Sequence, residues 1–224
     1  MISVAIDGPA GAGKSSVSKE AAKRLGYIYV DTGALYRAVG LKFSECGCGT
    51  ELDCDISKVL ADTSVDIRFI GGEQRVFLDE RDVSDKIRTP SASMMASAVS
   101  AKPEVRAFLL EMQRKIADNS NVLMDGRDIG TVVLPNATVK IFLTASAEIR
   151  AKRRFKELKE KGEAVSFEEV FEDMKQRDYN DMHRDIAPLK QAEDAVLADT
   201  GSCTFEESVE LVLKIVKEKL EAGK

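Results

Sequence analysis

The chain has 224 residues, of which 44% are hydrophobic and 32% are charged, and its formal net charge is −5. This length and apolar content suit one α/β domain with a full core and a small inserted subdomain. The negative charge argues against bulk binding to nucleic acid or to an acidic membrane, although local basic clusters can still bind small anions. No apolar run approaches the length of a membrane span and no secretory signal is present, so we expect a cytoplasmic protein.

A phosphate-binding motif lies near the start of the chain. The sequence GPAGAGKS at residues 8–15 fits G-x-x-x-x-G-K-[ST], between an apolar run at residues 2–6 and a helix-forming run at residues 14–25. Its glycines let main-chain N–H groups converge on an anion, and the helix N-terminus adds partial positive charge. In a site of this kind Lys14 reaches the β- and γ-phosphates and Ser15 ligates Mg²⁺. The motif therefore predicts nucleotide binding.

A second strand and a polar turn follow this motif. The β-branched and aromatic run at residues 27–30 predicts a buried strand, and residues 34–43 predict a helix. The turn at residues 31–33 lies at the carboxyl end of the strand, where ligands of open parallel sheets gather. With Tyr36 and Arg37 near the start of the helix, this turn is a candidate wall of a binding site.

The pattern then changes from helix–strand alternation to an antiparallel ribbon. Residues 56–61 predict a short helix, and residues 65–69 alternate apolar with charged side chains. Two glycines at residues 71–72 predict a hairpin turn, from which the chain returns at residues 76–78. We expect this insertion on the core to end near residues 87–88.

Four cysteines raise the question of a metal site. Cys46, Cys48 and Cys54 lie in one loop-like segment, whereas Cys203 and the single histidine, His183, are distant in sequence. Because no fourth ligand lies nearby, free reduced thiols are favoured over a zinc site. The single histidine also argues against a Ser-His-Asp hydrolase.

The second half of the chain again alternates helices with strands. Apolar runs predict strands at residues 122–124, 139–143 and 195–198. One helix is predicted to begin at Pro103 and another to span residues 148–161. Two more are predicted to begin at capping boxes near residues 166 and 204. Five strands alternating with helices predict a three-layer α/β fold of the P-loop NTPase class. It has a five-stranded parallel sheet with helices on both faces and a small antiparallel β-ribbon insertion.

Two classes of nucleotide-binding protein compete for this pattern. A GTPase switch reads guanine with an Asn-Lys-x-Asp motif, which the sequence lacks. A small-molecule kinase needs a second anionic pocket, which Arg37 and Arg127 can supply because a guanidinium binds two phosphate oxygens at once. For the arginines at residues 150–154, two interpretations stay open: phosphate contacts, or a solvated helix face paired with Glu148 and Glu157.

Several motifs together resemble those of bacterial cytidylate kinases along nearly the whole chain. They are residues 6–14, residues 31–37, DGRDIGT at residues 125–131, QRD at residues 176–178 with Asp181 and Arg184, and APL at residues 187–189. The DGRDIGT run and the β-ribbon are the specific features. The resemblance implies one kinase domain over residues 1–224, with a monophosphate-binding subdomain at about residues 33–106 and a short lid at about residues 151–166.

The resemblance also implies a role for each matching residue. Ser97, Arg106 and Asp128 resemble readers of the cytosine base. The residues implied to bind ATP are Gly8, Pro9, Ala10, Gly11, Ala12, Gly13, Lys14, Ser15 and Ser16, with Ser15 on the metal. Those implied to bind CMP are Thr32, Tyr36, Arg37, Ser97, Arg106, Arg127, Asp128, Arg177, Asp181 and Arg184, and the catalytic cations are Lys14, Arg127, Arg154, Arg177 and Arg184. The family often has serine where this chain has Ala10 and Thr32; Thr32 keeps the hydroxyl and Ala10 loses it.

The activity implied is phosphoryl transfer from ATP to CMP and dCMP with Mg²⁺, by a monomer that binds neither nucleic acid nor membrane. A kinase preferring UMP and a slow nucleotide-hydrolysing switch are the alternatives. Asp7, Asp31 and Asp125 all end strands and are candidates for holding metal-bound water. For Asp128, a purely structural role, capping the turn or pairing with Arg127, stands beside base recognition.

Overall fold

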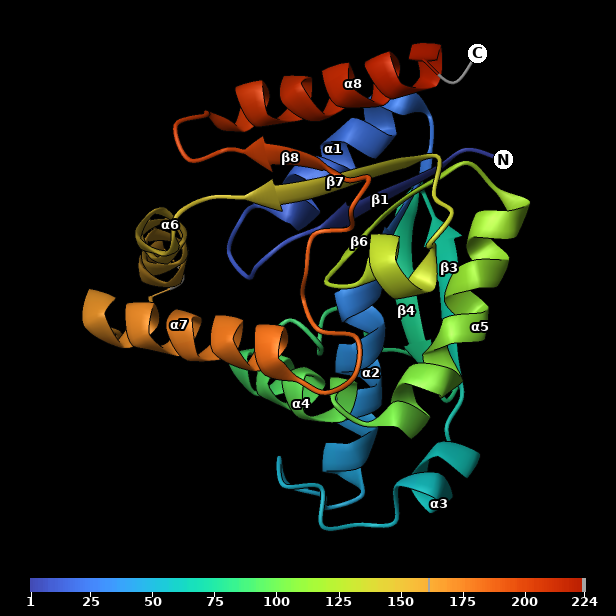
Figure 1. Cartoon of the computed structure of the whole chain (residues 1–224). Coiled ribbons are helices and arrows are strands. Elements are labelled where there is room, and N and C mark those ends of the chain that lie inside the picture. Colours follow the sequence, from blue (N-terminus) through green and yellow to red (C-terminus); the bar gives the residue numbers. More distant parts are fainter. Residues whose placement is uncertain (161, 223–224) are drawn as a thin grey trace.

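The computed structural model describes residues 1–160 and 162–222. Figure 1 shows a central parallel sheet, helices on both of its faces and an antiparallel ribbon. The strands are β1 (Ser3–Asp7), β2 (Ile28–Asp31), β3 (Val65–Ile70), β4 (Glu73–Leu78), β5 (Arg81–Asp82), β6 (Val122–Gly126), β7 (Val139–Thr144) and β8 (Val196–Asp199). The helices are α1 (Lys14–Leu25), α2 (Thr32–Glu45), α3 (Ile56–Ala61), α4 (Pro90–Ser100), α5 (Pro103–Asn119), α6 (Ala147–Glu160), α7 (Phe167–His183) and α8 (Phe205–Ala222), with a π-helix, η1 (Ile129–Val133).

The predicted fold class is confirmed. The five-stranded sheet has the order β2-β6-β1-β7-β8 with every neighbouring pair parallel, and β3, β4 and β5 form the antiparallel ribbon. The register places Asp7 beside Gly126 and Asp31 beside Asp125. The phosphate loop after β1 and the polar turns after β2 and β6 therefore meet at one edge of the sheet.

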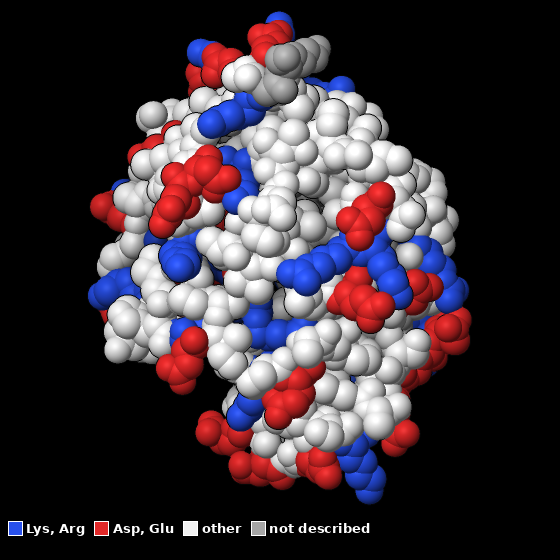
Figure 2. All heavy atoms as spheres, turned by 45° about the vertical axis from the view of Figure 1, so that its right-hand side comes forward, with Lys and Arg blue, Asp and Glu red and all other residues white. Residues whose placement is uncertain are grey.

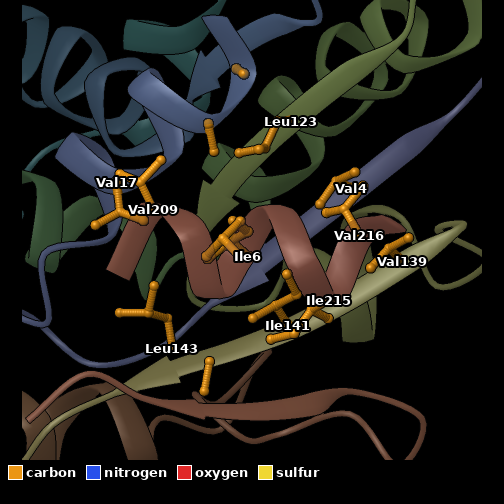
Figure 3. Packing of buried hydrophobic residues seen from close by; sticks show 14 of the residues in the cluster. Val4, Ile6, Val17, Leu123, Val139, Ile141, Leu143, Val209, Ile215 and Val216 are labelled. Atoms are coloured by element: carbon orange, nitrogen blue, oxygen red, sulfur yellow. The ribbon is translucent and has the colours of Figure 1, made fainter. Parts of the chain in front are cut away.

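Both faces of the sheet are buried, which explains why its strands are apolar runs rather than alternating patterns. Val4 and Ile6 of β1 belong to one core cluster, and Ala5 between them belongs to another. Figure 3 shows the first cluster, in which Val17 of α1 and Val209 of α8 pack over the strands. This packing fixes the direction in which β1 delivers the phosphate loop.

The ribbon contacts the parallel sheet through the apolar side chain of Ile67, which packs against the cluster that contains Val30 and Met124, and through polar side chains. The Gln74 side chain on β4 accepts a hydrogen bond from Asp31 N (2.7 Å) and donates one to Asp31 O (3.2 Å), so it pairs with the main chain of β2. Lys19 of α1 forms an exposed ion pair with Glu73 (2.7 Å). Only polar side chains make these two connections, and an exposed pair of this kind contributes little to stability.

Helix α4 is absent from the sequence prediction, which assigned no element between the ribbon and the helix that begins at Pro103. Its start has ordinary signals: the Thr89 hydroxyl accepts a hydrogen bond from Ala92 N (3.1 Å), and Pro90 occupies the first turn. The helix packs closely on α2, since a Cβ added at Gly40 would lie 2.9 Å from Met95 Cβ. It matters for function because it carries Ser97 and Ser100.

The expectation of free thiols is wrong for two of the cysteines. Cys48 and Cys54 form a disulfide between α2 and α3, where the loop brings their Cα atoms to 6.0 Å, while Cys46 and Cys203 are free. Over residues 1–160 and 162–222 there is no group of three His, Cys, Asp or Glu side chains placed to hold a metal ion.

Two further findings concern the helices. The helix predicted to end at residue 161 is seen to Glu160, and residue 161 lies outside the described residues. Within the part of the chain that is described, no helix has the length and apolar character needed to cross a membrane.

Candidate active site

The phosphate loop is shaped by tight contacts at its glycines. Gly8 (φ 150°) and Gly11 (φ 71°) have positive φ, and a Cβ at Gly8 would lie 2.0 Å from the Leu143 carbonyl oxygen. A Cβ at Gly11 would lie 2.8 Å from Met174 Cε. The Leu143 carbonyl excludes a side chain at Gly8 and the positive φ disfavours one at Gly11, so the main chain itself forms this wall of the site.

Lys14 lies buried at the start of α1, where its Nζ donates to the Pro9 carbonyl (2.7 Å). Burial, assisted by the positive charge of Arg127, lowers the pKa of Lys14 well below its usual value. A phosphate arriving beside the ammonium would oppose both effects, because a nearby negative charge favours the protonated form. The buried lysine is thus poised to bind an anion.

Of the three strand-end aspartates, Asp125 is the one beside Ser15. The Ser15 hydroxyl donates to Asp125 Oδ2 (2.8 Å) and the Tyr29 hydroxyl to Oδ1 (3.1 Å). Burial and the neighbouring charge of Asp31 raise the pKa of Asp125 to about 6. At neutral pH its carboxylate is ionised and, with the Ser15 hydroxyl, offers the hard oxygen ligands that suit Mg²⁺.

The other two aspartates hold the main chain instead. Asp7 accepts from Ile129 N and Gly130 N, both at 2.7 Å, and so anchors η1; its burial raises its pKa to about 6. Asp31 caps α2 by accepting from Ala34 N (3.0 Å). The sequence offered three aspartates as neighbours of a bound metal. In the structure, Asp125 is the one whose carboxylate lies next to the loop serine, Ser15.

A cleft of about 280 Å³ runs from the phosphate loop to α4, α5 and α7. Every residue that the resemblance assigned to CMP lines it. From the ATP set, Ala10, Gly11, Gly13, Lys14, Ser15 and Ser16 also line it. Gly8, Pro9 and Ala12 are not among its lining residues over the described chain: they shape the loop from behind.

The far wall of the cleft holds a buried cluster around Asp128. Arg106 Nη2 of α5 donates to Asp128 Oδ2, and Arg184 Nη2 lies 3.5 Å from Asp128 Oδ1. Burial raises the pKa of Asp128, whereas Arg106, Arg184 and Arg127 oppose that shift. A carboxylate acceptor and a guanidinium donor thus lie side by side at one spot.

The partner of Arg127 is Asp181 rather than Asp128. Arg127 Nε donates to Asp181 Oδ2 (2.8 Å), and nearby Arg177 has a buried Nε with no hydrogen-bond partner among the described residues. Burial and Arg127 lower the pKa of Arg177 to about 10. Positive charge is concentrated here beyond what the aspartates neutralise, as an anion site requires.

Two predicted residues, Thr32 and Ser97, take part in hydrogen bonds through different groups. Thr32 donates to Asp125 O (2.8 Å), so its remaining capacity toward a ligand is as an acceptor. Ser97 lines the cleft, and its carbonyl accepts from Ser100 Oγ (2.9 Å).

Ser100 was missed by the sequence analysis, yet its carbonyl accepts from Arg106 Nη1 (3.2 Å) and its hydroxyl lies 3.5 Å from Arg184 Nη1. Its position one helical turn after Ser97 is the signal that could have found it.

The arginines at residues 150–154 divide into separate environments. Arg154 pairs with Glu157 (2.8 Å) on α6 and, within the described chain, is not among the cleft-lining residues. Arg150 is buried, with its guanidinium against the phosphate loop. The solvated-face interpretation thus describes the Arg154 pairing but not Arg150, and Glu148 pairs with Lys152 (2.6 Å) rather than with an arginine.

Comparison with known proteins agrees with this geometry. A family model described as cytidylate kinase matches residues 4–218. Curated cytidylate kinases from Caldicellulosiruptor saccharolyticus and Carboxydothermus hydrogenoformans are each 53% identical to this chain. The alignments cover 96% of this chain in both cases, and 95% and 97% of the respective relatives.

A solved structure of an uncharacterised protein from Eubacterium ventriosum matches with a TM-score of 0.55 at 12% identity. It covers 97% of this chain and 99% of its own, and this likeness supports the fold alone. Taken with the family model and the relatives at 53% identity, these findings show that the chain belongs to the cytidylate kinase family.

Proposed function

We propose that this cleft transfers the γ-phosphoryl group of ATP to CMP and dCMP, giving ADP with CDP or dCDP. The observation that supports it most is the buried cluster of Arg106, Asp128 and Arg184 in the same cleft as Lys14 and Ser15. A phosphate loop alone indicates only nucleotide binding. The added cluster supplies a second, selective subsite for the acceptor.

The donor nucleotide is held mainly by the main chain of the loop. Its N–H groups and the N-terminus of α1 bind the phosphate oxygens, and Lys14 exchanges the Pro9 carbonyl for the transferring phosphoryl group. Positive charge placed there in advance stabilises the charge of the transition state. The acceptor phosphate is already an anion at neutral pH, so no general base is required.

Base selection follows from the donor and acceptor pattern of Asp128 and Arg106. Cytosine presents a 4-amino donor next to the N3 acceptor, which match a carboxylate and a guanidinium respectively. Uracil would turn a carbonyl oxygen toward the Asp128 carboxylate, so that two acceptors would face each other with no hydrogen bond between them. Such a mismatch costs about 1–3 kcal/mol, roughly a ten- to hundredfold preference.

The remaining arginines neutralise the phosphates. Arg127 and Arg184 are assigned to the CMP phosphate, and Arg177 and Asp181 to the sugar. Arg127 is paired with Asp181, so an incoming phosphate replaces Asp181 as a partner of Arg127. Arg154 lies outside the cleft lining, and its catalytic role in this proposal requires closure of the lid at residues 151–166.

Mg²⁺ belongs to the proposal as the cofactor bound with ATP. Ser15 and Asp125 are the residues that would hold it, because their adjacent hydroxyl and carboxylate oxygens fit its preference for one or two protein ligands plus phosphate oxygens. When bound, the ion neutralises negative charge on the phosphates.

The rest of the proposal is a cytoplasmic monomer that acts on free nucleotides and not on nucleic acid. On the face shown in Figure 2, positive and negative side chains are interspersed, without the broad basic area that nucleic acid attracts. Size-exclusion chromatography with light scattering tests the monomer.

A coupled assay of ADP release over CMP, dCMP, UMP and AMP tests the activity. We expect release that depends on added CMP or dCMP and on Mg²⁺, with UMP slower by the factor given above. Release dependent mainly on UMP would favour the alternative kinase. Release independent of any monophosphate would favour a hydrolysing switch and overturn the proposal.

A further inference from the structure

Arg150, in the first turns of α6, connects three segments of the chain. Its side chain is buried, and all three of its nitrogens donate hydrogen bonds. Nε donates to Ala145 O (2.9 Å), Nη1 to Ala10 O (2.8 Å) and Nη2 to Asp178 Oδ2 (2.6 Å). Within the described chain Arg150 is not among the cleft-lining residues, so it joins the phosphate loop to α7 from behind.

The contact with Ala10 determines the orientation of one peptide unit in the loop. In a trans peptide the C=O and the following N–H point in opposite directions. Because Arg150 holds the Ala10 carbonyl on its own side, the Gly11 N–H points away from Arg150, and Gly11 lines the cleft. An N–H aimed in this way is what a phosphate-binding loop needs.

The contact with Asp178 secures the other wall of the cleft. Asp178 lies on α7 between Arg177 and Asp181, both of which line the cleft. One turn earlier, Met174 packs on Gly11, where an added Cβ would lie 2.8 Å from Met174 Cε and 3.4 Å from Arg150 Cβ. Helix α7 therefore meets the donor loop directly, and Arg150 forms the hydrogen-bonded part of that junction.

We propose that Arg150 is a positioning residue that fixes the Ala10–Gly11 peptide of the donor loop relative to the acceptor side chains of α7. The inference rests on the proposed function, in which one phosphate lies on the loop and the other against α7. Phosphoryl transfer needs the attacking oxygen in line with the transferring group, and a misplacement of about 1 Å can lower the rate about a hundredfold. Arg150 touches neither substrate in this assignment, so its loss affects turnover more than binding.

The principal variant is Arg150→Lys. It keeps a positive charge beside Asp178, so the buried charge stays paired and the protein stays folded. A single ammonium lacks the planar fork that reaches three acceptors in different directions. We expect kcat to fall about 10- to 100-fold and the KM values for ATP and CMP to change by less than about threefold.

The matched control is Lys140→Met, which removes another buried cation, one that pairs with Asp194 (2.8 Å) away from the cleft. Its kcat is expected within about twofold of the parent, with assays run well below the unfolding temperature of every variant. Asp178→Asn, which keeps the shape of the carboxyl group, should lower kcat in the same direction but less than Arg150→Lys.

Hydrogen exchange over residues 8–14 without nucleotide gives a readout independent of activity. Arg150→Lys should speed exchange there, and Lys140→Met should not. A parent-like kcat in Arg150→Lys, or a KM increase above tenfold with unchanged kcat, overturns the positioning role. If the parent shows no CMP-dependent activity, the proposed function fails, while faster exchange in Arg150→Lys still supports the junction with the loop.

Discussion

The two walls of the cleft are built in different ways. The donor wall is main chain, shaped by glycines with positive φ and completed by one lysine. The acceptor wall consists of side chains from α5, α7 and the turn after β6, arranged as arginine–aspartate pairs. A wall made of main chain is encoded in a few consecutive residues, whereas a wall made of side chains depends on residues brought together by the fold. The first kind is general for nucleotides, and the second selects one of them.

The largest expected effect is on the donor wall. Replacing Lys14 with Ala removes the phosphate-loop cation assigned to the transferring group, so we expect kcat to fall by about 10³-fold or more. The matched control is Lys19→Ala, which removes an exposed lysine of the same helix and its pair with Glu73; it should stay within about twofold. Steady-state kinetics with saturating ATP measures both. A Lys14→Ala turnover within threefold of the parent would contradict the assignment.

The acceptor wall is tested by the choice of base. Asp128→Asn keeps the shape and removes the charge, and an amide can present either its donor or its acceptor face. We expect kcat/KM for CMP to fall about 10- to 100-fold, with a much smaller change for UMP. Asp181→Asn is the control, because a sugar contact should weaken both substrates alike. Equal losses for both substrates in Asp128→Asn would make Asp128 structural and leave base reading to Ser97 and Arg106.

Asp125 lies where the two walls meet, beside Ser15 of the donor loop, and the pH dependence of protein stability tests its raised pKa. The pKa of Asp125 is about 6 in the folded protein and near 3.8 when unfolded, so its contribution to stability is present below about pH 4 and is lost as the pH rises through about 6. Asn does not titrate. The stability of Asp125→Asn relative to the parent should therefore increase between pH 4 and pH 7, by on the order of 1 kcal/mol or more.

Urea unfolding of both proteins without nucleotide or metal measures this difference. Asp7, which has a similarly raised pKa, is present in both proteins and largely cancels in the comparison. The same stability difference at pH 4 and pH 7 would show that the pKa of Asp125 is not raised in the folded protein.

The smallest expected effect concerns movement of the acceptor side. We propose that the subdomain at about residues 33–106 closes as a unit when CMP binds, because a kinase must exclude water from the transferring group. With CMP at ten times its dissociation constant, exchange there should slow by up to about tenfold. The strands β1 and β7 serve as an internal reference. Unchanged exchange throughout residues 33–106 would rule the closure out.

The sequence predicted the elements that depend on short, local patterns of residues. The loop, the five strands and the ribbon follow from patterns within ten or so residues, and the fold confirmed them. The pairing of Asp128 with Arg106 and Arg184 spans distant parts of the chain, so only the family resemblance brought these residues together before the structure did. No spacing rule relates them.

The errors also have physical causes. Arg150 stands in the run RAKRR, which has the composition of a solvated helix face, and burial of one member depends on how α6 meets the loop. The start of α4 at Thr89 and Pro90 was recognisable but was not used. The first two N–H groups of the π-helix η1 donate to Asp7, a residue more than a hundred positions earlier, so local propensity does not reveal this contact.

The side chain of Gln74 has a consequence outside catalysis. Strand β2 is at the edge of the parallel sheet, where unpaired N–H and C=O groups invite a strand from another molecule. By bonding to both main-chain groups of Asp31, the Gln74 amide takes the place that such a strand would occupy at that residue. The ribbon therefore also hinders pairing between the sheets of two molecules. A variant that lacks the Gln74 amide would expose this edge and be more prone to aggregate, even with its active site intact.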